Sequence, residues 1–136
     1  MFIFCVGVSL GGIGSGTIGR SYLGEFCRQQ ISPPSIYQYG INYRNNFHLC
    51  VSSKTNPTKK KFITTLAYRR PEVRGVSAWK CAIPPKDIEY IGLYPRSWTR
   101  YTIGELGLVL TCRQISPVIP HNYKVSNFDM LLELKA

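Results

Sequence analysis

The chain contains 136 residues, of which 44% are hydrophobic and 12% aromatic. This is the length of one domain, and the composition is too apolar for a chain that stays unfolded. Seventeen lysines and arginines face only seven acids, so the formal net charge is +10. Such a balance excludes an acidic surface and favours phosphate-rich partners.

Short strands separated by turns are predicted along the chain. Residues 1–8 are apolar, but they fall far short of the roughly 20 residues that a membrane-spanning helix needs, so we expect a first strand there. A glycine-rich block follows from Gly7 to Gly24, and residues 32–35 form a proline-containing turn. Aromatic, β-branched and threonine residues in short runs predict further strands at 41–51, 61–68, 87–93, 98–103 and 106–115.

The last predicted strand has the clearest periodicity. Apolar residues at every second position from Leu106 to Cys112 alternate with a set that becomes polar toward Arg113, which indicates one buried and one exposed face. No segment shows the period of an amphipathic helix. The pattern therefore predicts an all-β domain with the architecture of a β-sandwich, here incomplete.

The cysteines indicate reduced, structural thiols. They are odd in number, widely spaced and without a Cys-x-x-Cys pair that could hold zinc, at positions 5, 27, 50, 81 and 112. The sequence also lacks an acceptor for N-linked glycosylation, because Pro57 blocks the site at Asn56. Both facts favour a cytosolic setting without a bound metal.

Eight basic residues gather between positions 54 and 80, with Glu72 as the one acid among them. The stretch predicts either a solvated loop or a site for an anionic membrane or nucleic acid. The Lys59–Lys61 triplet beside Pro57 favours the loop. One alternative function is a free-standing basic module that binds anionic lipid or nucleic acid through Lys59–Lys61, Phe62, Tyr68 and Trp79.

Residues 14–19 match the G-x-G-x-x-G spacing of dinucleotide-binding sites. That fingerprint requires a helix directly after the glycines and an acid about 20 residues further on. Gly24 argues against the helix, and after Glu25 no acid occurs before Glu72. The residues favour a glycine-rich turn in a β domain.

Asp87 and Glu89 form the best candidate pair for glycoside hydrolysis, which generally uses two carboxylates. Two residues apart on one strand, they would share a face at roughly 7 Å. The simpler interpretation is an exposed polar face that alternates with Ile88 and Tyr90. A small hydrolase that uses this pair remains the third hypothesis.

The histidines offer weaker candidates. His48 and Cys50 would share a strand face and could form a nucleophile and base only with a third, orienting group. His121 follows Pro120 in a predicted loop, where a structural hydrogen bond is its expected role.

Three stretches carry a family resemblance. Residues 9–18, read as Ser-Leu-Gly-Gly-Ile-Gly-Ser-Gly-Thr-Ile, with Arg20, Gly24-Glu25-Phe26 and Arg28, resemble the opening motif of the non-lysosomal glucosylceramidases, glycoside hydrolase family 116. Residues 93–101 and 110–123 look like the second and third motifs of that family, so the match spans about residues 8–126. The residues that carry it are Gly11, Gly12, Gly14, Gly16, Arg20, Glu25, Phe26, Arg28, Tyr94, Pro95, Arg96, Trp98, Arg113, Pro120, His121 and Tyr123.

The resemblance implies the first part of a longer enzyme, a retaining β-glucosidase that removes glucose from glucosylceramide. In this family an α-helical barrel follows the sandwich and carries the nucleophile and the acid/base carboxylate. We therefore expect residues 1–126 to be a partial amino-terminal sandwich and residues 127–136 a divergent tail. With the catalytic barrel absent, no residue here is expected to be catalytic and the chain alone is expected to be inactive.

The resemblance also implies the partners. The domain would contact the catalytic barrel, reach glucosylceramide only through that barrel, and require no cofactor or metal. Peripheral contact with anionic lipid is expected at the cytosolic face of the endoplasmic reticulum, Golgi or plasma membrane, where each basic residue contributes about 1 kcal/mol. Nucleic acid is not an expected partner.

Overall fold

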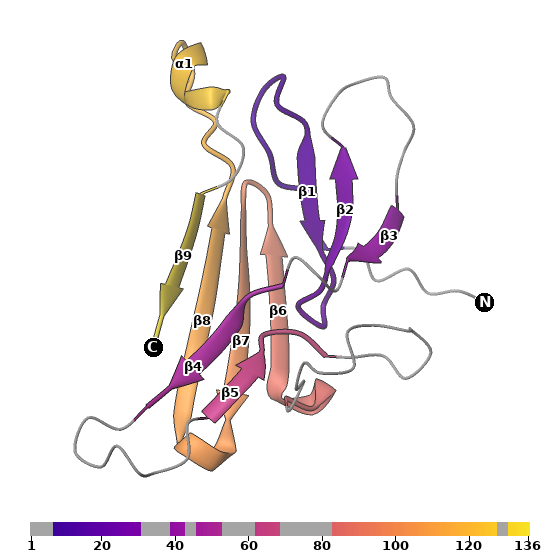
Figure 1. The fold of residues 1–136 in the computed structure, drawn as a ribbon. Helices are drawn as coiled ribbons and strands as arrows, with labels where there is room; N and C mark the ends of the chain where they lie inside the picture. Colours follow the sequence, from indigo (N-terminus) through magenta and orange to yellow (C-terminus); the bar gives the residue numbers. More distant parts are fainter. Residues whose placement is uncertain (1–6, 31–38, 43–45, 53–61, 69–82, 128–130) are drawn as a thin grey trace.

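The computed structural model describes six segments of the chain: residues 7–30, 39–42, 46–52, 62–68, 83–127 and 131–136 (Figure 1). Antiparallel strands make up most of these segments, together with a single four-residue α-helix. The predicted all-β class is confirmed. The predicted strand at residues 1–8 and the proline turn at 32–35 fall mostly or wholly outside the described residues.

Three antiparallel sheets contain all the described strands. The first sheet has the order β1 (Thr17–Arg20), β2 (Phe26–Gln30) and β3 (Tyr39–Asn42), and the second pairs β4 (His48–Val51) with β5 (Phe62–Thr65). The third has the order β6 (Ile88–Leu93), β7 (Arg96–Ile103), β8 (Leu108–Ile115) and β9 (Leu131–Lys135). Short helical turns lie at η2 (Pro85–Asp87), η3 (Gly104–Leu106) and α1 (Tyr123–Ser126).

The four-stranded sheet has one buried and one exposed face. Along β7, Ser97, Thr99, Tyr101 and Ile103 are buried and alternate with residues that are exposed or half-buried. In β8 the apolar residues Leu110 and Cys112 are likewise buried, which confirms the alternation predicted there. Successive side chains of a strand point to opposite faces, so this pattern gives the sheet an inner and an outer face.

The β4–β5 hairpin packs on the inner face, and Arg20 of the first sheet reaches the same face. The main core joins Leu66, just after β5, to side chains of β6, β7 and β8, and Phe62 and Leu49 of the hairpin pack against it. Figure 1 shows β4 and β5 crossing in front of the larger sheet, with β1–β3 beside them. Burial of these apolar faces against each other gives the layered packing of a β-sandwich.

The structure departs from the predicted elements at four places. Leu106, predicted to begin the last strand, is exposed in η3, and β8 begins at Leu108. Asp87 lies in η2 rather than in a strand, because Pro84 and Pro85 begin that turn. The run at 41–51 divides between β3 and β4, which belong to different sheets. Residues 131–135, assigned to a tail, form β9 and pair with β8 from Thr111 to Ile115.

Among the described residues, no helix has the length and apolar character needed to cross a membrane.

Candidate functional site

The glycine-rich loop forms a tight turn that leads directly into β1. Gly14 and Gly16 have φ angles of 83° and 89°, a region that residues with a Cβ rarely adopt. Thr17 then begins a strand where a dinucleotide fingerprint needs the start of a helix. The turn interpretation of this motif is confirmed, and the nucleotide interpretation is wrong.

Ser116 joins the three motifs at one end of the four-stranded sheet. Its hydroxyl accepts a hydrogen bond from the Gly11 amide at 2.9 Å. Its own amide donates to the Pro95 carbonyl in the β6–β7 turn at 2.8 Å. One buried serine therefore binds the first motif and the second motif to the third, and we call this arrangement the motif junction.

A second set of hydrogen bonds ties the end of the third motif to the glycine loop. The Ile13 amide donates to the Ser126 carbonyl at 2.7 Å. The hydroxyl of Ser126, at the end of α1, bonds both the amide and the carbonyl of Ile119. Because these bonds close the loop from 119 to 126 on itself, the junction is held by backbone groups whose positions the turns fix.

Arg20 anchors the first motif in the interior, at the end of β1. Its guanidinium, only 1% exposed, donates to the Gly24 carbonyl at 2.6 and 3.1 Å and to the Tyr101 hydroxyl at 2.7 Å. It also donates to the Cys112 sulfur at 3.1 Å. The side chain thus connects β1 with β7 and β8, and its donors find acceptors in a site without water exposure.

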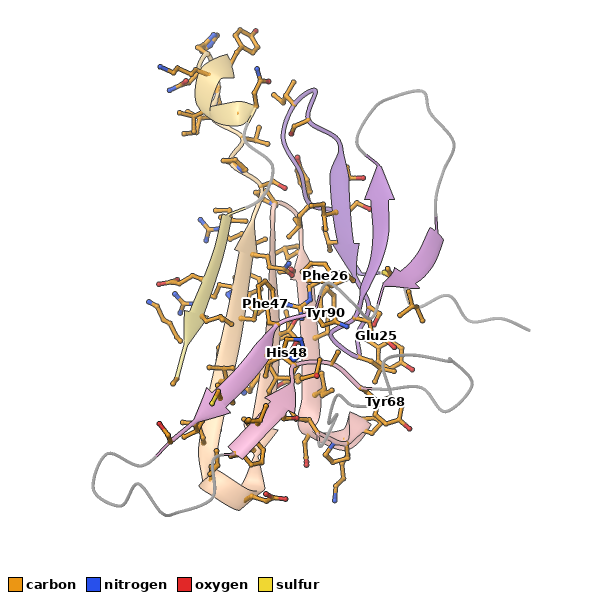
Figure 2. All side chains as sticks on the ribbon, in the orientation of Figure 1. Glu25, Phe26, Phe47, His48, Tyr68 and Tyr90 are labelled. Atoms are coloured by element: carbon orange, nitrogen blue, oxygen red, sulfur yellow. The ribbon has the colours of Figure 1, made fainter. Side chains whose placement is uncertain are left out.

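Two aromatic rings complete the surroundings of this cation. The Arg20 guanidinium lies 4.9 Å from the centroid of the Phe26 ring and 5.7 Å from that of Phe47. The two rings meet edge to face with centroids 5.7 Å apart, and Figure 2 labels both near the centre of the molecule. Ring faces attract a cation, so the charge is stabilised on the side away from the carbonyls.

Burial changes the acidity of two groups beside Arg20. Desolvation raises the pKa of the Tyr101 phenol to about 12, although the nearby Arg20 charge acts in the opposite direction. Desolvation also raises the pKa of the Cys112 thiol, again against the effect of Arg20. Both groups therefore stay protonated at neutral pH and serve as hydrogen-bonding partners within the core.

Glu25 of the first motif is also buried. Its carboxylate accepts a hydrogen bond from the Ser21 hydroxyl at 2.5 Å, and its carbonyl accepts one from the Ser21 amide at 2.8 Å. Gly24, with a φ of 80°, makes the turn between them. Glu25 therefore fixes the β1–β2 turn, and its burial indicates a structural function.

Other motif residues lie at the surface near the junction. Tyr94 is 60% exposed at the β6–β7 turn, and Tyr123 is 70% exposed at the start of α1. Pro120 and His121 are exposed in the preceding loop, where His121 has a φ of 62°. Arg28 belongs to β2, but its side chain lies outside the described part.

Three further motif residues project from the outer face of the four-stranded sheet. Trp98 lies directly opposite Arg113 on β8, and Arg96 lies opposite Ile115. Arg96 and Arg113 are exposed and Trp98 is half-buried, whereas the core lies against the other face. Sequence reasoning placed all three in family motifs but did not assign them to one face.

The candidate carboxylates Asp87 and Glu89 lie on two adjoining elements. Asp87 belongs to η2, while Glu89 is exposed on β6 and pairs with Arg100 at 3.4 Å. The ion pair joins two neighbouring strands, and each of its side chains is 58% exposed. Such pairs are common on a solvated sheet face. The interpretation as a polar surface is favoured over the hydrolase.

The remaining candidates are His48, Cys50 and His121. His48 and Cys50 share the exposed face of β4 as predicted, and the His48 ring lies 3.2 Å from the Thr65 hydroxyl on β5. In the described segments, no group of three metal-ligating side chains is present. His121 is exposed.

Two aromatic residues of the alternative function, a basic module that binds anionic lipid or nucleic acid, contact the core. Phe62 and Tyr68 are half-buried and pack against the main core cluster, so only part of each ring is available to a ligand. The Lys59–Lys61 triplet and Trp79 lie outside the described residues.

The fold and the motif junction define an all-β domain whose three motifs converge at one end of a layered sheet. A family model described as beta-glucosidase 2, glycosyl-hydrolase family 116 N-term, matches residues 7–130. The chain belongs to glycosyl-hydrolase family 116 and corresponds to its amino-terminal domain. Such a domain has a catalytic domain as its partner.

Proposed function

We propose that this chain is a non-catalytic domain that supports the catalytic domain of a glucosylceramidase. The observation that carries the proposal is the match of residues 7–130 to the amino-terminal domain of the family. The two acids that a hydrolase would require nearest each other in sequence, Asp87 and Glu89, lie on different elements. We assign catalysis by two opposed carboxylates to the partner, in agreement with the family match.

The motif junction gives this supporting role a physical basis. Ser116 and Arg20 fix three loops and two layers relative to each other through hydrogen bonds between buried groups. Preorganised surfaces bind with a smaller loss of conformational entropy than flexible ones. A rigid domain of this kind can hold the loops of a catalytic domain in place.

The proposed substrate of the complete enzyme is glucosylceramide, in agreement with the resemblance of the motifs. The net charge of +10 supports peripheral attachment to an anionic, cytosol-facing membrane, since basic residues near such a surface are attracted to it. Binding to vesicles of phosphatidylcholine with and without phosphatidylserine measures this attachment. Equal binding to both vesicles would contradict it.

Reconstitution tests the proposed function. The purified chain, a catalytic domain of a family 116 enzyme, and a mixture of both are assayed with glucosylceramide and a chromogenic β-glucoside. We expect no hydrolysis by the chain alone and a higher rate in the mixture than with the catalytic domain alone. Hydrolysis by the chain alone that is lost in Asp87→Asn or Glu89→Gln would replace this proposal with the small hydrolase.

A further inference from the structure

The outer face of the four-stranded sheet carries an apolar surface near the motif junction. In the strand register, Leu93, Arg96 and Ile115 form one row across β6, β7 and β8. Ile91, Trp98 and Arg113 form the next row. We call these six residues the outer patch.

The outer patch differs from the rest of the same face. Leu93 is 71% exposed and Ile91 is 51% exposed. Large aliphatic side chains of this kind are usually covered in a folded protein. The next row along the strands is polar and consists of Glu89, Arg100 and Thr111. An exposed antiparallel sheet face is ordinarily polar, so the cluster of apolar residues at the junction end is unusual. At the far end of the same face only Val109 is an exposed large apolar residue of β8, at 47%.

The charges of the outer patch are unevenly compensated. Arg113 pairs with Glu133 on β9 at 3.6 Å, and Arg100 in the adjoining row pairs with Glu89 at 3.4 Å. Arg96 has no carboxylate within ion-pair range among the described residues, although it lies between Leu93 and Ile115. A partner that covers this row would have to present a carboxylate to Arg96 to avoid burying an unpaired charge.

The outer patch lies apart from the main core cluster. The core cluster includes Tyr101 and Leu110 from the opposite face of β7 and β8. Tryptophan and arginine are the residues most enriched at the energetic centres of protein interfaces. Trp98 between Ile91 and Arg113 therefore has the composition of an interface centre rather than of a solvated strand.

We propose that the outer patch is the surface on which the catalytic domain docks, with Trp98 as the central apolar anchor and Arg96 bound to a carboxylate of that domain. This inference rests on the proposed function, because the partner is the catalytic domain. It adds which face of the sheet is covered and what chemistry covers it, an apolar surface that carries an acidic group.

Two acids border the outer patch. Glu133 lies in the row of Trp98, and Glu89 lies in the adjoining row. Because these acids pair with Arg113 and Arg100, they reduce the positive charge that this face can offer to anionic headgroups. On a protein partner, in contrast, acids paired with Arg113 and Arg100 form an ordinary polar rim.

Binding measured by interferometry tests the docking face. The immobilised chain is titrated with the separately expressed catalytic domain of a family 116 enzyme. We expect Trp98→Ala and Arg96→Ala each to weaken the affinity roughly tenfold or more, as substitutions at interface centres do. The matched controls are Thr102→Ala, about 13 Å further along the same face of β7, and Arg100→Ala, which are expected to change the affinity less than threefold.

The outcomes separate the two proposals. If the unmodified chain does not bind the catalytic domain, the supporting function fails. If it binds and the two outer-patch variants bind as tightly, with unchanged circular dichroism, the function stands and the docking face is wrong. Loss of binding to phosphatidylserine vesicles in Trp98→Ala, with unchanged binding to the catalytic domain, would assign the patch to a membrane instead.

Discussion

The guanidinium of Arg20 and the phenol of Tyr101 form a hydrogen bond of 2.7 Å that links the first motif to the centre of the four-stranded sheet. The phenol in turn donates to the Leu66 carbonyl at 2.9 Å. Arg20 of the first sheet, Tyr101 of the third sheet and Leu66, just after the second sheet, are therefore joined by hydrogen bonds in the interior. The stability of the domain should depend strongly on this point.

Replacement of Arg20 by methionine is expected to lower the free energy of unfolding by about 3 kcal/mol or more. The change keeps much of the side-chain volume but leaves the Gly24 carbonyl without its charged donor, and buried unpaired groups are costly. Urea unfolding followed by circular dichroism measures the effect. The control is Arg100→Met on the exposed face, expected within about 0.5 kcal/mol of the unmodified chain; equal effects of the two substitutions would show that Arg20 is not an anchor.

The stability of the domain is expected to fall between pH 10 and pH 12. Burial raises the pKa of Tyr101 to about 12 in the folded state, whereas the unfolded phenol ionises near pH 10. In that interval the unfolded chain binds fewer protons than the folded chain, so the stabilisation present below pH 10 is lost as the pH rises.

The loss reaches up to roughly 3 kcal/mol by pH 12, because one unit of pKa corresponds to about 1.4 kcal/mol. Urea unfolding at a series of pH values measures it. Tyr101→Phe should be less stable at pH 8 but should show a shallower decline. The stability of Tyr94→Phe, which removes an exposed phenol, should decline with pH as that of the unmodified chain does. If the stability of Tyr101→Phe declined equally steeply, ionisation of Tyr101 would not be the cause.

Alanine is expected to be poorly tolerated at Gly24 and well tolerated at Gly104. Gly24 has a φ of 80°, and a Cβ there would lie 2.5 Å from the Tyr101 hydroxyl oxygen and 2.9 Å from the Leu66 carbonyl oxygen. A Cβ at Gly104 would meet nothing within 4 Å. We expect Gly24→Ala to lower the Tm by roughly 10 °C, through strain and displacement of Tyr101. A similar Tm for both variants would argue against the close packing at this turn.

Ser116→Ala is expected to loosen the motif junction locally. The substitution removes the hydroxyl that accepts from the Gly11 amide, at a cost of about 1 kcal/mol. Hydrogen exchange measures the change: the Gly11 amide should exchange several-fold faster, while amides paired between β7 and β8 keep their rates. An unchanged rate at Gly11 would mean that another group protects it.

Cys50 is expected to react first among the three described cysteines. It is exposed on β4, whereas Cys27 and Cys112 are buried, and burial raises the pKa of the Cys112 thiol. Since the thiolate is the reactive species, labelling of the folded chain with maleimide followed by peptide mass spectrometry should modify Cys50 well before Cys112. Rapid labelling of Cys112 in a folded chain would contradict its buried position.

The strands with strict alternation were predictable from the sequence. β7 and β8 place buried or half-buried residues inward at every second position, from Ser97 to Ile103 and from Leu108 to Gln114. Most of them are small, aromatic or aliphatic, and Gln114 is polar. Burial of one face imposes this period and fixes the register. β9 lacks a clear alternation in Leu131–Lys135 and is held by pairing with β8, so a pattern of side chains could not identify it.

The motif residues were predictable as a set, but their positions were not. Arginine is seldom fully buried, and nothing next to Arg20 in the sequence indicates the carbonyls of Gly24 and Leu66 that receive it. The outer patch required the register between β6, β7 and β8, which brings Ile91, Trp98 and Arg113 into one row. Contacts of this kind arise from tertiary pairing, which local patterns do not encode.

The hydrogen bond from Gly11 to Ser116 spans 105 positions of the chain, and the bond from Arg20 to Tyr101 spans 81. During translation the glycine loop is made long before either of its partners exists. Pairing over such separations is also intrinsically slow, because a long stretch must be closed before the contact is gained. The glycine loop is therefore expected to reach its final shape only after the strands that carry Tyr101 and Ser116 have been made.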